Sequence, residues 1–174
     1  ELVLKFLPDN RGAKDFLSIL FNERGVNKWN AGLTDFSVNG GIYDMEKALE
    51  FNYENARAKK NLSIMYSLLG WKYIRQKDRN NDSIPEMFNK ALELDKDNED
   101  AKKGFSIYWN DLGIACGNTD DKETATKCFI LALQYAPLEK TIIGNLRRVS
   151  YSKYQEHVNA LKEYGIDLEQ EDEE

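Results

Sequence analysis

Residues 55–70 read NARAKKNLSIMYSLLG, and the pattern of this stretch occurs three times in the chain. The other two copies are NRGAKDFLSILFNERG over 10–25 and NEDAKKGFSIYWNDLG over 98–113. All three share an asparagine, Ala-Lys, a Leu or Phe followed by Ser-Ile, and a closing glycine that recurs after 45 and then 43 residues. Repeats with periods of roughly 20 to 50 residues are typical of solenoid proteins. We therefore expect a repeat protein.

A second shared element indicates that each repeat is a pair of segments. ALEFNYEN begins at Ala48 and ALELDKDN begins at Ala91, which is again 43 residues later. A third copy, ALQYAPLE, begins at Ala132, and LKFLPDN from Leu4 is similar to the ends of the first two. The chain is therefore expected to start inside a repeat, near the last turn of a second helix.

Both segment types have the apolar periodicity of helices. Steps of three, four and seven residues place apolar side chains on one helix face. These stripes are Ala58, Leu62, Leu69 and Tyr73 in the first type, and Ile84, Phe88, Ala91 and Leu92 in the second. Capping patterns at Ser83–Glu86 and at Asp120 with Glu123 predict helix starts. Gly40 and Gly41 are interpreted as a linker between two helices.

Small residues at fixed places predict that the two helices of a repeat approach closely. Gly70 and Gly113 lie on the first helices, and Ala91 and Ala132 lie on the second. A large residue at such a contact overpacks it, at a cost of about 1–3 kcal/mol. Gly113→Leu is therefore expected to lower the melting temperature.

Composition and charge limit the classes of function. The chain has 41% hydrophobic and 31% charged residues and a net charge of -6, as in a soluble folded protein. Six acids lie from Asp167 onward, so the preceding chain is formally neutral and no nucleic-acid partner is expected. No apolar run is long enough for a membrane span, and no secretory signal is visible at Glu1. The chain starts without a methionine, so upstream residues can be missing.

Few residues suit metal or catalytic chemistry. Cys116 and Cys128 are expected to be buried free thiols, although a disulfide between them stays open. His157 is the single histidine, and no metal-ligand spacing accompanies it. The sequence contains no phosphate-binding glycine loop and no nucleophile elbow. We expect neither an enzyme nor a bound metal or cofactor.

The repeats resemble the tetratricopeptide family, whose unit carries W-x2-L-G-x2-Y, A-x3-F and a terminal proline. The third copy carries most of this pattern, with Cys116 at the tyrosine place. The matching residues are Trp109, Leu112, Gly113, Ala125, Phe129, Ala132 and Pro137. The second copy matches with a two-residue insertion between its helices, at Tyr66, Leu69, Gly70, Tyr73, Phe88 and Ala91. In the first copy Arg24 replaces the leucine and Lys28 the tyrosine, and Trp29 is expected to take over their packing.

The resemblance implies an all-α fold, a right-handed superhelical solenoid of helix-turn-helix repeats with a C-terminal capping helix. The lead-in before each copy lengthens the first helix by about two turns relative to the family's unit of roughly 34 residues. The expected divisions are the end of a truncated repeat (1–9), three repeats (10–53, 55–96 and 98–137), a capping helix (138–166) and an acidic disordered tail (167–174).

The resemblance also implies a scaffold that binds a peptide or helix of a partner protein on a concave surface formed by the first helices. Family geometry places three residues of each repeat there. These are Asn22, Val26 and Trp29; Ser67, Trp71 and Ile74; and Asn110, Ile114 and Gly117. The inferred surface is apolar with small polar side chains and suits an amphipathic or apolar segment.

Several alternatives remain open from the sequence. Trp71 and Ile114 can equally be packing residues, and Trp71→Ala is expected to distinguish loss of partner binding from loss of fold. Relatives that bind the carboxyl ends of heat-shock chaperones carry cations where this chain has Asn22, Ser67 and Asn110, so that activity is not expected. The repeats can also be an accessory module of a larger membrane-attached or enzymatic protein. Partner identity and oligomeric state stay open, as does the compartment, with the cytoplasm slightly favoured.

Overall fold

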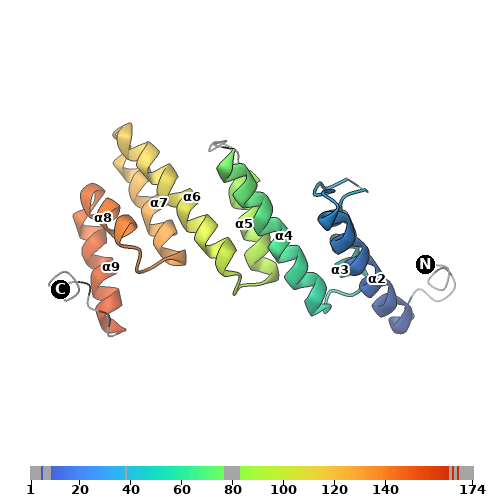
Figure 1. Cartoon of the computed structure of the whole chain (residues 1–174). Helices are drawn as coiled ribbons and strands as arrows, with labels where there is room; N and C mark the ends of the chain where they lie inside the picture. The colour runs from blue at the N-terminus through green and yellow to red at the C-terminus, as the bar shows by residue number, and fades with distance from the viewer. Residues whose placement is uncertain are drawn as a thin grey trace. The chain divides into compact units, whose positions relative to one another are not determined.

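The computed structural model describes residues 5, 9–37, 39–76, 83–164, 166 and 168. All regular structure in these residues is α-helical (Figure 1), which confirms the predicted all-α class. The chain forms two compact units, residues 1–101 and 102–174. The described helices are α2 (Arg11–Asn30), α3 (Gly41–Phe51), α4 (Ala56–Arg75), α5 (Ser83–Leu94), α6 (Glu99–Asn118), α7 (Lys122–Tyr135), α8 (Lys140–Val149) and α9 (Tyr151–Glu163).

Long and short helices alternate through the three repeats. The first helices α2, α4 and α6 each have 20 residues, and the second helices α3, α5 and α7 have 11, 12 and 14. In the first unit α2 packs on α3 and α4 packs on α5, while α4 also contacts both helices of the preceding pair. The long first helices agree with the extended lead-in expected from the sequence.

The repeated asparagine starts each first helix. Its side-chain oxygen accepts a hydrogen bond from the backbone N–H three residues later, which satisfies a donor that the helix itself leaves unpaired. These bonds join Ala13 to Asn10, Ala58 to Asn55 and Ala101 to Asn98, at 2.9, 3.1 and 2.9 Å. The repeated alanine therefore marks the first turn of the helix.

The repeated serine connects helices that are far apart in the chain. Ser63 is fully buried, donates to the backbone oxygen of Ala91 at 2.7 Å and accepts from the Asn98 amide at 2.8 Å. One hydroxyl thus ties α4 to the end of α5 and to the cap of α6. In the preceding repeat, Ser18 accepts from the Asn55 amide at 2.8 Å in the same way.

Aromatic rings cover two of the three closing glycines. A Cβ atom at Gly70 would lie 2.7 Å from the ring of Phe88, and one at Gly113 would lie 2.8 Å from the ring of Phe129. The predicted close approach of the helices is thus present, with a phenylalanine ring against each glycine. Ala91 makes a different contact, because its backbone oxygen accepts the hydrogen bond from the Ser63 hydroxyl.

Gly41 does not belong to a linker, which corrects the interpretation of the Gly40-Gly41 pair. Gly41 is the first residue of α3, and a Cβ there would lie 2.6 Å from the backbone oxygen of Gly25. Met45 fills the remaining space beside Gly25, as Phe88 does beside Gly70. The first helix pair therefore has backbone against backbone where the others have an aromatic ring.

An ion cluster replaces apolar packing in the first repeat. The Arg24 guanidinium binds both carboxylate oxygens of Asp44 at 2.6 and 2.7 Å, and the Lys28 ammonium lies 3.0 Å from the same carboxylate. Asp44 is fully buried. The expectation that Trp29 takes over this packing is therefore incomplete: Trp29 is half-buried beside Gly41, and the charged trio fills the space.

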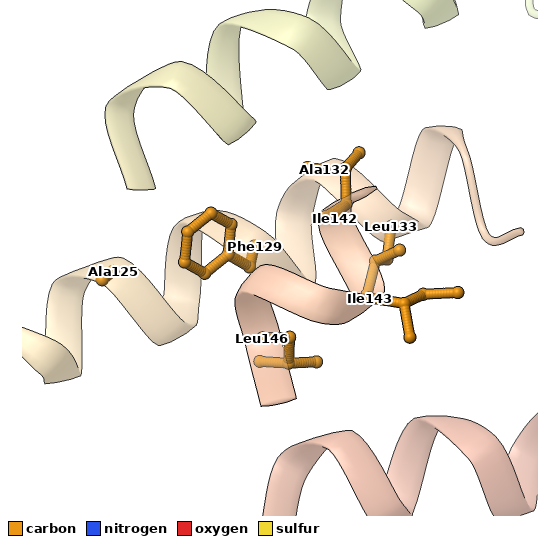
Figure 2. Close-up of a cluster of buried hydrophobic side chains, with 7 residues drawn as sticks. All are labelled: Ala125, Phe129, Ala132, Leu133, Ile142, Ile143 and Leu146. Atoms are coloured by element: carbon orange, nitrogen blue, oxygen red, sulfur yellow. The ribbon is translucent and has the colours of Figure 1, made fainter. Parts of the chain in front are cut away.

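In the second unit, α7 and α8 share an apolar core (Figure 2). Its buried side chains are Ala125, Phe129, Ala132, Leu133, Ile142, Ile143 and Leu146.

The helix α7 is capped by Asp121 and not by Asp120, which instead adopts a positive φ of 62° in the turn. The segment predicted as one capping helix contains two, because the backbone becomes extended at Ser150 between α8 and α9. The predicted divisions 1–9 and 167–174 lie outside the described residues except for Lys5, Asp9 and Leu168.

Candidate protein-binding surface

Two of the residues predicted to face a partner are buried. Asn22 is 5% exposed, and its side-chain oxygen accepts a hydrogen bond from the Asn61 amide at 3.0 Å. Ser67 is 2% exposed, and its hydroxyl has no hydrogen-bond partner among the described residues. The bond to Asn61 places the Asn22 side chain in the contact between α2 and α4. Their side chains are not available on the surface of the first unit.

Trp71 is half-buried and held in one orientation. Its indole N–H donates to the backbone oxygen of Asp100 at 3.1 Å. Its ring meets the ring of Phe88 edge to face, with the centroids 6.3 Å apart. The Trp71 side chain therefore packs inside the first unit and is also partly exposed. It is neither purely a core residue nor a freely exposed one, which were the two alternatives from the sequence.

The other predicted positions differ in accessibility. Val26, Trp29 and Ile74 of the first unit are half-buried. In the second unit, Asn110 accepts a hydrogen bond from Asn145 at 2.9 Å, and Ile114 is 40% exposed. Gly117 is half-buried, and a Cβ atom there would lie 3.9 Å from the side chains of Ala125 and Val149.

An apolar stripe runs along the exposed side of α4, and the prediction named only one of its three residues, Trp71. We call Ile64, Leu68 and Trp71 the α4 stripe. Their spacing of four and three residues places them within roughly 60° of the helix circumference. Ile64 and Leu68 are 44% and 48% exposed, while Leu62 and Leu69 on the opposite side are 2% and 4% exposed. The helix is thus packed on one face and apolar on the other.

Positive charge surrounds the α4 stripe. The sequence of α4 contains five basic residues and no acidic residue. Four of these flank the stripe: Arg57 and Lys60 precede it, and Lys72 and Arg75 follow it. We call these four residues the basic ends. All four are exposed, and among the described residues none of them forms an ion pair. The remaining one, Lys59, lies over the Tyr53 ring and near Glu54.

The equivalent face of α2 is also apolar. Phe16 and Ile19 are 61% and 50% exposed, and Ile19 holds the place in α2 that Ile64 holds in α4. The hydrogen bond from Asn61 to Asn22 joins the two helices beside these residues. One departure is Glu23, which is exposed at the place of Leu68. Both helices therefore expose apolar residues at equivalent places, and of the two only α4 contains no acidic residue.

Other chemistry-bearing groups are engaged in local contacts. The Nε2 atom of His157 donates to the backbone oxygen of Pro137 at 2.9 Å. Beside it, Lys153 is paired with Glu156 at 2.6 Å. Cys116 and Cys128 are free thiols, and burial raises the pKa of Cys128 to about 11.

In the described part of the chain, no group of three or more His, Cys, Asp or Glu side chains could hold a metal ion. No helix among those residues has the length and apolar character that crossing a membrane requires.

Together these features define an all-α protein of packed helix pairs with a basic-flanked apolar face on one first helix. The chain matches no model of a known protein family, and comparison with curated proteins finds no match.

Proposed function

We propose that this chain is a protein-interaction scaffold of tetratricopeptide-like helix pairs that binds a peptide or helix of a partner on its first helices. The observation that carries the proposal is the α4 stripe. Its large apolar side chains are aligned on one helix face, and Ile64 and Leu68 are almost half exposed, which is typical of protein contact sites. Asn61, which lies one turn before Ile64, bonds to the buried Asn22 of α2, while Ile64 and Leu68 stay 44% and 48% exposed.

The repeat architecture supports the same proposal. Three 20-residue first helices share one asparagine cap, and two of these caps bond to the serine of the preceding repeat. Such stacked helix pairs present their first helices as an extended surface in solenoid proteins. We include the right-handed superhelical arrangement in the proposal.

The test is site-specific photo-crosslinking in cells of the source organism. A photo-reactive phenylalanine analogue replaces Ile64 or Leu68 in the full chain, and in a control it replaces the exposed Glu93 of α5. We expect the same partner protein to be crosslinked from both α4 positions and not from position 93. Equal crosslinking from all three positions, or none from α4, would contradict the proposal.

A further inference from the structure

From the charge pattern of α4 we infer the chemistry of the partner: an amphipathic helix with an apolar central face and acidic residues at both ends. This inference rests on the proposed function and goes beyond it, because it specifies which kind of segment binds. The sequence suggested only an amphipathic or apolar segment, because the inferred surface is mostly apolar, and it showed no carboxylate clamp at the expected positions. The structure shows exposed cations at other positions of α4, namely the basic ends.

The first step concerns the shape of the occupant. All backbone groups inside α4 are used within the helix, so the stripe offers apolar side chains and no free backbone donors or acceptors. An extended peptide lying there would leave its own backbone groups unpaired where it displaces water. A helix satisfies its backbone internally and presents apolar residues at steps of three and four, which match Ile64, Leu68 and Trp71.

The second step concerns the charge of its ends. Arg57 and Arg75 are 18 positions apart on one side of the helix, which corresponds to about 27 Å. Lys60 and Lys72 lie between them, on either side of the stripe. Acidic residues spaced to meet both ends would pair with cations that have no partner within the described structure, whereas basic residues would be repelled. Charge complementarity therefore favours an acidic partner.

Two acidic residues outside α4 are placed beside the stripe by the repeat pattern or by a contact. Glu23 of α2 is exposed at the place equivalent to Leu68, and Asp100 supplies the backbone oxygen that holds Trp71. On α4 itself no carboxylate offsets the positive charge. An anionic membrane surface would also attract the basic ends, but a flat bilayer does not select the spacing between them. We therefore commit to a protein helix and include the membrane as an outcome of the test.

The experiment uses the full chain and three synthetic helical peptides of about 18 residues, the length that spans the basic ends. The peptides share one leucine face and differ only in their end residues, which are glutamate, glutamine or lysine. Binding is measured by fluorescence anisotropy at several salt concentrations, and the site is mapped by backbone amide chemical shifts. We expect the glutamate peptide to bind at least about tenfold more tightly than the lysine peptide, with a difference that shrinks as salt screens the charges.

Charge-reversed variants give the matched comparison. Arg57→Glu with Arg75→Glu should weaken binding of the glutamate peptide about tenfold and strengthen binding of the lysine peptide. Lys96→Glu with Lys122→Glu makes the same change in net charge at exposed sites off α4 and should change neither affinity more than about twofold. Circular dichroism checks that each variant is folded, and Arg57→Gln with Arg75→Gln serves if the reversed pair is not.

The outcomes separate this inference from the proposed function. If the glutamine and glutamate peptides bind α4 equally tightly, the inferred partner charge is wrong while the protein-binding face stands. If no peptide shifts the α4 amides, the inference fails, and the crosslinking experiment decides the proposed function. Binding of phosphatidylserine vesicles through Arg57 and Arg75, with no binding of the glutamate peptide, would overturn the inference in favour of a membrane surface.

Discussion

The side-chain amide of Asn55 donates to the hydroxyl of Ser18 at 2.8 Å, although 37 residues separate the two in the chain. The oxygen of the same amide accepts from the backbone of Ala58 and starts α4. One asparagine therefore sets where a helix begins and also fixes that helix against the preceding pair. Asn98 and Ser63 repeat this arrangement with nearly the same distances. The repeated Asn and Ser of the sequence are thus partners across repeats.

Asn55→Ser separates these two roles. Serine is a good helix cap but is too short to reach Ser18, whose buried hydroxyl then loses its donor. We expect a loss of about 1–2 kcal/mol in unfolding free energy, measured by urea denaturation. Asn10→Ser is the control, because Asn10 caps α2 and no hydrogen bond joins it to an earlier serine among the described residues; its effect should stay within about 0.5 kcal/mol. Equal losses in both variants would contradict a separate role for the Ser18 contact.

Asp44→Asn should make stability depend less on pH. Burial opposes the charged form of Asp44, but hydrogen bonds from Arg24 and Lys28 outweigh it and hold the pKa below the usual value of 3.8. A carboxylate with a lowered pKa stabilises the fold fully above its unfolded-state pKa, and this contribution is lost as pH falls through the folded-state pKa. The variant should lose about 1–3 kcal/mol at pH 7. The gap to the unmodified protein should narrow below about pH 4, and a constant gap down to pH 2 would contradict the assignment.

Replacing the whole ion cluster should restore the stability that Asp44→Asn removes. The second repeat carries Leu69, Tyr73 and Met87 at the places of Arg24, Lys28 and Asp44. Arg24→Leu, Lys28→Tyr and Asp44→Met together therefore copy a packing that the chain already uses. Buried ion pairs replaced by apolar residues of suitable size often cost nothing. We expect a triple variant within about 1 kcal/mol of the unmodified protein by thermal unfolding, whereas Asp44→Met alone should be clearly less stable.

Gly113→Ala and Gly144→Ala should change the melting temperature in opposite directions. A methyl group at Gly113 meets the Phe129 ring at 2.8 Å, and the displacement should cost about 1–3 kcal/mol. A methyl group at Gly144 meets nothing within 4 Å, so the higher helix propensity of alanine should stabilise α8 by about 0.5–1 kcal/mol. Scanning calorimetry measures both. A stabilised Gly113→Ala variant would show that the ring moves aside at no cost.

Much of the candidate surface can be predicted from the sequence. The apolar steps from Ile64 to Trp71 and the absence of acids in α4 are visible without coordinates. What the periodicity cannot say is which of two apolar faces is covered. Both Leu62 and Leu68 fit helical stripes, yet one is buried and the other is 48% exposed, because α3 and α5 pack on one side only. Asn22 and Ser67 also lie at helical positions that the sequence placed on the surface, yet both are buried, Asn22 because α2 packs against α4.

The sequence by itself determined the helices and their repetition, because capping and helical periodicity act between residues at most a few positions apart. Each first helix starts with such a local bond, made by the side chain of Asn10, Asn55 or Asn98. Only the tertiary structure decided the contacts of Asn55 with Ser18, of Gly41 with Gly25, and of Asp44 with Arg24. These contacts depend on how one helix face lies on another, and packing geometry over 16 or more residues of chain leaves no local pattern to recognise.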